Sequence, residues 1–264
     1  MNACATEDKF VSVPSGRLFT RRWTPSTCQT DVPLVLFPDS LGCVALWRDF
    51  PDALATRLQR PVIAYDRLGF GRSDRREGVP TAAFVTEEAT IYFPALAEEL
   101  GLTRYALMGH SVGGGMALIC AALNPDRCEA VITEAAQAFV EPKTTQGITE
   151  AKELFHDPQQ FKRLAKYHGD HARWVLDAWT EVWLSAEFAS WTLDPYLGSV
   201  VCPVLAIHGD KDEYGSLAFP EKIAGSVSGR AQMEILKACG HVPHREQKEA
   251  VLQLIERFLS EFAA

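Results

Sequence analysis

The stretch 105–123, YALMGHSVGGGMALICAAL, places one serine between two apolar runs of different length. Residues 105–108 are short enough for a buried strand, and residues 114–123 are long enough for a helix. Between them, Gly109-His110-Ser111-Val112-Gly113 forms a Gly-x-Ser-x-Gly motif. At a strand-to-helix junction this motif holds the serine on a tight, strained turn. Ser111 is therefore the candidate nucleophile.

Other apolar runs indicate the strands of a sheet. Residues 10–13 and 17–23 alternate as in a hairpin, and Pro14-Ser15-Gly16 supplies the turn. The remaining runs are unbroken, which is typical of strands that are buried on both faces. They cover residues 32–37, 61–65, 105–108, 130–133, 204–208 and 233–236.

Helical patterns separate these strands. Strands that alternate with helices predict an α/β fold with a mostly parallel sheet and helices on both faces. The patterns cover residues 47–58, 83–100, 114–123 and 247–262.

The segment 139–200 contains no good strand pattern. It is too long for an ordinary connection, and we predict a helical insertion after the sixth strand. Residues 1–138 and 201–264 then form the core. We expect the tryptophans of the insertion mainly to pack it onto the core. Its helical patterns cover residues 148–155, 159–168 and 171–184. Its tryptophans are Trp174, Trp179, Trp183 and Trp191.

A serine hydroxyl needs a base within hydrogen-bond reach, and the base needs an acid that orients it. In folds with such a strand-serine-helix turn, called a nucleophile elbow, the chain order is serine, acid, histidine. His241 follows the last strand and precedes the last helix, so it is the candidate base. The competitor His244 is expected in the first turn of the final helix, at the surface.

The acid is expected after the strand that ends near His208. Asp212 is the candidate, and Asp210 is expected to form a turn or a cap. Glu134, after an earlier strand, is the alternative acid.

An acyl-transfer site also needs N–H groups that stabilise the developing oxyanion. The backbone N–H of Val112, directly after the nucleophile, is one candidate. The other is expected from the loop Pro38-Asp39-Ser40-Leu41-Gly42, with Ser40 as the predicted donor. Pro38 has no N–H and cannot contribute.

Composition narrows the class of protein. The 264 residues carry a net charge of −8, which argues against binding to nucleic acid or to anionic membrane surfaces. The seven cysteines show no Cys-x-x-Cys spacing, so neither disulfides nor zinc are expected. Cys239 is expected to pack under the loop that holds His241. The first eight residues lack the features of a signal peptide, and the predicted location is the cytoplasm.

Four motifs occur in the order seen in the α/β-hydrolase superfamily, which the chain resembles over essentially its whole length. They are the elbow at Ser111, the turn 66–73 (DRLGFGRS), Gly209-x-x-Asp212 and Gly240-His241. The resemblance is to the esterase- and lipase-like branch with a helical cap, and it implies about eight strands. One departure is Pro38-Asp39, where the family commonly has His-Gly.

The resemblance implies a serine hydrolase, most simply a carboxylesterase that acts on a small, apolar or aromatic ester without cofactor or metal. A carbon–carbon bond hydrolase, a cofactor-free oxygenase and a receptor-like ligand-binding member are the alternatives. The expected partner is a small-molecule substrate, and a homodimer is left open. Serine at the elbow argues against haloalkane dehalogenases and epoxide hydrolases, which carry aspartate there.

Overall fold

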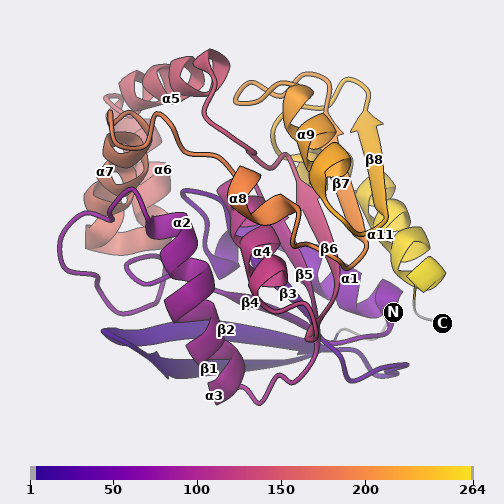
Figure 1. Cartoon of the computed structure of the whole chain (residues 1–264). Coiled ribbons are helices and arrows are strands. Elements are labelled where there is room, and N and C mark those ends of the chain that lie inside the picture. Colours follow the sequence, from indigo (N-terminus) through magenta and orange to yellow (C-terminus); the bar gives the residue numbers. More distant parts are fainter. Residues whose placement is uncertain (1–3, 263–264) are drawn as a thin grey trace.

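A single eight-stranded sheet organises the chain in the computed structural model, which describes residues 4–262 (Figure 1). Residues 1–3, which begin the N-terminal stretch discussed above, and residues 263–264 lie outside the described part. The strand order is β1-β2-β4-β3-β5-β6-β7-β8. The strands are β1 (Ala5–Val13), β2 (Gly16–Thr24), β3 (Leu34–Phe37), β4 (Val62–Tyr65), β5 (Tyr105–His110), β6 (Cys128–Glu134), β7 (Val204–Gly209) and β8 (Ala231–Leu236).

Only the N-terminal hairpin departs from parallel pairing. β1 pairs with β2, and β2 pairs with β4, in antiparallel register. All other neighbours, from β4 across to β8, are parallel. The predicted mostly parallel sheet of about eight strands is confirmed.

The unbroken apolar strands arise because the sheet has a hydrophobic core on each face. In β3, Val35 and Phe37 face one core, and Leu34 and Leu36 face the other. Successive side chains of a strand point to opposite faces, so a strand covered on both sides needs apolar residues throughout.

Helices cover the two faces. α1 (Phe50–Leu58) and α11 (Lys248–Phe262) belong to one core, and α3, α4 and α9 belong to the other. The predicted helix 83–100 forms as three consecutive pieces, with a π-helical turn η2 in the middle. The bounds on this second face are α2 (Phe84–Glu87), η2 (Glu88–Tyr92), α3 (Phe93–Glu99), α4 (Val112–Leu123) and α9 (Ala218–Ser226).

The segment between β6 and β7 is helical. Figure 1 shows α5, α6 and α7 grouped at one end of the molecule, and α8 next to α4. Phe139 and Thr192 form an isolated bridge, so the segment leaves and returns at neighbouring points. The division of the chain at residues 139 and 200 stays a prediction. The helices are α5 (Pro142–Leu154), α6 (Pro158–His168), η3 (Gly169–His171), α7 (Ala172–Trp183) and α8 (Asp194–Leu197).

No helix within residues 4–262 combines the length and the apolar character needed to cross a bilayer.

Candidate active site

Ser111 lies on the turn between β5 and α4, with a φ of 56°. This left-handed conformation is uncommon for a residue with a side chain. A Cβ on Gly109 would lie 2.1 Å from the carbonyl oxygen of Gly113, and one on Gly113 would lie 2.3 Å from that of Phe37. The neighbouring backbone lies so close to both positions that only glycine fits there.

Ser111, His241 and Asp212 form one hydrogen-bonded chain. His241 comes from the loop between β8 and α10 (Pro243–Glu246), and its Nε2 lies 3.0 Å from Ser111 Oγ. Its Nδ1 lies 2.9 Å from both carboxylate oxygens of Asp212. The structure thus brings the three predicted residues together from three separate loops.

Backbone groups hold the Asp212 carboxylate. Its Oδ1 accepts hydrogen bonds from the N–H groups of Tyr214, at 2.7 Å, and Gly215, at 3.1 Å. Burial alone would raise the pKa of Asp212, but its hydrogen bond and ion pair with His241 and these N–H donors lower it. His208 Nε2 lies 3.3 Å from the same carboxylate, and burial lowers the pKa of His208. The ionised carboxylate therefore keeps a proton on His241 Nδ1.

The start of the helical insertion fixes the loop that carries Asp212. The Glu141 carboxylate accepts the Ser216 N–H at 2.7 Å and the Ser216 hydroxyl at 2.9 Å. Thr144 Oγ1 donates to the Tyr214 carbonyl at 2.7 Å. Because these contacts hold the residues directly after Asp212, the insertion helps to set the position of Asp212.

The two other candidate acids have different partners. Asp210 Oδ2 lies 3.9 Å from Lys237 Nζ, and the buried Asp210 Oδ1 has no hydrogen-bond partner among the described residues. Glu134 Oε2 lies 2.5 Å from His244 Nδ1. Asp212 is thus the carboxylate beside His241.

The prediction that His244 lies at the surface is wrong. α10 turns its side chain inward, where it is 4% exposed and packs against the rings of Trp47 and Phe50. Burial would raise the pKa of Glu134, but the charge and hydrogen bond of His244 lower it. Sequence spacing missed this Glu134–His244 pair because its members are 110 residues apart.

A buried arginine shapes the loop that is expected to complete the oxyanion site. Arg67 Nη2 donates to the carbonyls of Asp39, at 3.0 Å, and Ser40, at 3.2 Å. In a trans peptide the N–H points away from the carbonyl, so the Ser40 N–H is turned away from Arg67. Ser40 lines the same cavity as Ser111. Val112 begins α4, with its N–H in the first helical turn.

His110 joins the two loops that meet at Ser111, a role that sequence reasoning did not assign. Its Nε2 lies 2.7 Å from the His241 carbonyl, and its Nδ1 lies 3.3 Å from Asp39 Oδ2. Burial would lower the pKa of His110, but the Asp39 hydrogen bond and charge raise it. Burial would raise the pKa of Asp39, but the hydrogen bond and charge of His110 and the Leu41 N–H lower it well below its usual range.

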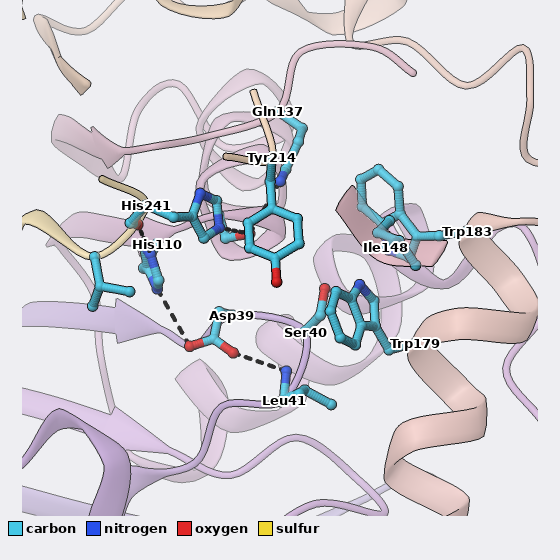
Figure 2. Close-up of a pocket in the computed structure, with 12 residues that line it drawn as sticks. Asp39, Ser40, Leu41, His110, Gln137, Ile148, Trp179, Trp183, Tyr214 and His241 are labelled. Carbon is cyan, nitrogen blue, oxygen red and sulfur yellow. Dashed lines mark hydrogen bonds and ion pairs between the residues drawn. The ribbon is translucent and has the colours of Figure 1, made fainter. Parts of the chain in front are cut away.

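A cavity of about 140 Å³ opens beside Ser111. Figure 2 shows Ile148, Trp179 and Trp183 on one side of it, across from Tyr214 and His241. The sequence did not show which residues of the insertion line it. The full lining is Asp39, Ser40, Leu41, His110, Ser111, Gln137, Ile148, Trp179, Trp183, Tyr214, His241 and Val242.

Cys239 is fully buried, and burial raises its pKa to about 12. The expected burial of Cys239 is confirmed, and its place beneath the His241 loop stays a prediction. Within residues 4–262, no group of three or more His, Cys, Asp or Glu side chains is arranged to hold a metal ion.

The mostly parallel sheet with a serine elbow after β5 defines the α/β-hydrolase class of fold. Comparison with known proteins agrees. The chain belongs to the alpha/beta hydrolase fold family, whose model matches residues 32–188.

Relatives within the family include hydrolases of several kinds. The chain is 27% identical over 224 residues to the 2-hydroxymuconate semialdehyde hydrolase of Pseudomonas putida, covering 76% of this chain and 78% of that protein. It is 31% identical over 125 residues to the (lyso)-N-acylphosphatidylethanolamine lipase of Bos taurus. That match covers 47% of this chain but only 36% of the length of the lipase.

Solved structures share the fold. The carboxylesterase of Bacillus subtilis has a TM-score of 0.70 at 23% identity, covering 97% of this chain and 92% of that one. The 2-hydroxy-6-oxo-6-phenylhexa-2,4-dienoate hydrolase of Rhodococcus sp. strain RHA1 has a TM-score of 0.77 at 19% identity, covering 97% and 99%. At these identities the likeness extends to the fold alone.

Proposed function

We propose that the protein is a serine hydrolase that cleaves small, apolar or aromatic carboxylic esters through Ser111, His241 and Asp212. The observation that supports this most directly is the hydrogen-bonded chain from Asp212 through His241 to Ser111, at 2.9 and 3.0 Å, which ends at the cavity. A nucleophile, a base and an orienting acid in this arrangement suit acyl transfer.

The proposed reaction assigns a role to each of these groups. His241 Nε2 removes the Ser111 hydroxyl proton as Oγ attacks the ester carbonyl carbon, and Asp212 stabilises the imidazolium. The N–H groups of Val112 and Ser40 stabilise the carbonyl oxygen as it gains charge. The imidazolium then protonates the departing alkoxide, which leaves an acyl-enzyme. Water, deprotonated by His241, releases the acid and restores Ser111.

Cavity size and lining support a small substrate. A cavity of about 150 Å³ admits one benzene molecule, so the space of about 140 Å³ beside Ser111 suits a short acyl chain or a single ring. Trp179, Trp183 and Ile148 offer it an apolar wall. Polar groups that could fix its orientation come from Ser40 and Gln137.

Carbon–carbon bond hydrolysis is the second candidate, favoured by the Pseudomonas putida relative. The names of that relative and of the Rhodococcus hydrolase describe substrates of the muconate or dienoate type. Such carboxylates are commonly bound by arginine or lysine. Among the described residues that line the cavity, none is lysine or arginine. This favours the ester.

A substrate panel tests the proposal. We expect p-nitrophenyl acetate, butyrate and benzoate to be hydrolysed with kcat/KM values at least about 10-fold above that of p-nitrophenyl octanoate. The reason is that the outer methylene groups of the octanoyl chain do not fit inside the cavity. A vinylogous 1,5-diketone carboxylate should be a poor substrate. Faster cleavage of the diketone than of every ester would contradict ester hydrolysis and support carbon–carbon cleavage.

A further inference from the structure

Gln137 is a buried amide at the nucleophile that the proposed reaction does not use. It lies on the segment after β6, is 4% exposed and lines the cavity (Figure 2). Its Oε1 lies 3.2 Å from Ser111 Oγ. Among residues 4–262, Gln137 and His241 have the side chains that lie in hydrogen-bond contact with the reacting oxygen.

The protons of the hydrogen-bonded chain decide how this amide acts. An ionised Asp212 only accepts, so His241 Nδ1 carries a hydrogen. In the neutral imidazole Nε2 is then the acceptor, and Ser111 must donate its hydroxyl hydrogen to it. A hydroxyl has one hydrogen, so Ser111 cannot also donate to Gln137.

Because the Ser111 hydroxyl hydrogen is donated to His241 Nε2, an amide oxygen 3.2 Å from Oγ would face only the oxygen lone pairs, which is unfavourable. Rotation of the amide by 180° exchanges its oxygen and nitrogen without moving the rest of the side chain. The rotated amide makes a favourable contact, because Nε2–H donates to Oγ.

We propose that Gln137 is a further catalytic residue, whose amide N–H donates a hydrogen bond to Ser111 Oγ. The proposal rests on the proposed function of Ser111 as the nucleophile. When His241 takes the proton, the O–H bond breaks, an N–H bond forms on the imidazole and negative charge develops on Oγ. A donor aimed at Oγ stabilises that charge and fixes the Ser111 rotamer until the bond to the carbonyl carbon forms.

Two variants test this role with one readout, the second-order rate of Ser111 labelling by a fluorophosphonate. Gln137→Met keeps a similar length and removes the donor. Loss of one hydrogen bond to a developing charge is worth about 1.5 kcal/mol, so labelling should slow about 10-fold at every pH. The pH profile should keep the wild-type shape.

Gln137→Glu supplies the distinctive signature. Its carboxylate can only accept and repels the charge on Oγ, so at pH 8 labelling should fall by more than the methionine variant does. As pH falls and the carboxyl protonates, its O–H restores a donor, and the rate relative to wild type should rise at least about 10-fold. At low pH the labelling rate of Gln137→Glu should exceed that of Gln137→Met, which a merely structural role would not produce. Gln159→Glu, an exposed position in α6, is the matched control and should follow wild type throughout.

Wild-type labelling of Gln137→Met, with unchanged thermal unfolding, would overturn the proposal. If that variant does not unfold cooperatively, Gln137→Glu decides, and a pH-independent ratio to wild type would overturn it. If Ser111→Ala is not labelled while either of these results is obtained, Ser111 remains the proposed nucleophile and only the role of Gln137 is overturned. The two proposals can therefore fail independently.

Discussion

His110 shows how much a single side chain can fix at the site. Both of its ring nitrogens face acceptors, the His241 carbonyl and the Asp39 carboxylate. A neutral imidazole can donate only once, so this environment favours the doubly protonated ring. Glu134 adds a further negative charge nearby, and the His244 ring packs against the same imidazole. The resulting ion pair ties the Asp39 loop to the His241 loop.

Asp39→Asn should therefore lower stability in a pH-dependent way. The folded pKa of Asp39 is lowered, so its contribution is present above its ordinary value of 3.8 and is lost as pH falls. The folded pKa of His110 is raised, so its contribution is present below 6.5 and is lost as pH rises past the folded value. Urea unfolding should show the variant losing about 2 kcal/mol between about pH 4 and 6.5, with a smaller loss at pH 9. An equal loss at all pH values would argue against the ion pair.

Sequence reasoning at this scale succeeded where chain order carries the information. Ser111, Asp212 and His241 were predicted from an elbow and two loops that follow strands, and the structure brings them together. Their catalytic role stays a proposal. The contacts of Gln137 and His110 at the site were missed because their partners are defined only by tertiary contact.

At the scale of elements, the turn 66–73 after β4 is held by its own first residue. The Asp66 carboxylate accepts the N–H groups of Val44 and Arg72, and the Asp66 carbonyl accepts the Ser73 hydroxyl. Burial raises the pKa of Asp66 to about 6 although the backbone donors oppose it. The Gly71 N–H donates to His168 Nδ1 at 2.9 Å, which links this turn to α6.

Gly71→Ala should disrupt that turn. Gly71 has a φ of +53°, and an added Cβ would lie 2.1 Å from Asp66 Oδ2. We expect a loss of about 3 kcal/mol in the free energy of unfolding, measured by urea titration, from backbone strain and steric overlap together.

Gly78→Ala is the matched control because Gly78 also has a positive φ, +67°, but open space around its Cβ position. It should cost only about 1 kcal/mol. Equal losses for the two variants would mean that the contact with Asp66 contributes nothing.

The predicted elements fared according to their pattern. Unbroken apolar runs located β3 to β8, and the alternating hairpin pattern located β2 and the end of β1, which begins at Ala5 rather than at Phe10. Helix boundaries were less exact. The helix predicted from Trp47 begins at Phe50, because Val44–Trp47 forms a 3-10 turn and Arg48 has a positive φ. α8, α9 and α10 were missed, and for α8 and α10 four residues are too few to show a period.

At the scale of the whole molecule, the tryptophans of the helical insertion divide between packing and cavity. Trp183 is 1% exposed and also packs on Phe188 and Trp191, and Trp174 lies on Gly69. Trp179 combines a cavity-facing position with a ring contact to Tyr214. The expectation that the tryptophans mainly pack the insertion onto the core fits Trp174, but Trp179 and Trp183 also line the cavity. Sequence spacing could not show which ones do so.

Trp179→Ala should change specificity by enlarging the cavity. Longer acyl chains then fit, and the ratio of kcat/KM for p-nitrophenyl octanoate to that for the acetate should rise at least about 10-fold. Trp174→Ala, in the same helix but outside the cavity lining, should leave this ratio unchanged. An unchanged ratio in both variants would mean that Trp179 does not limit the acyl group.

The claim that joins all three scales is that Ser111 is the nucleophile. Intact-protein mass spectrometry after fluorophosphonate treatment tests it directly, with ester hydrolysis measured on the same samples. We predict one adduct, mapped to the Ser111 peptide, no adduct in Ser111→Ala, and a fall in its kcat of roughly 10³-fold or more. Ser260→Ala, on the exposed side of α11, should behave as wild type. A Ser111→Ala protein that hydrolyses esters at the wild-type rate, or an adduct on another residue, would contradict the account.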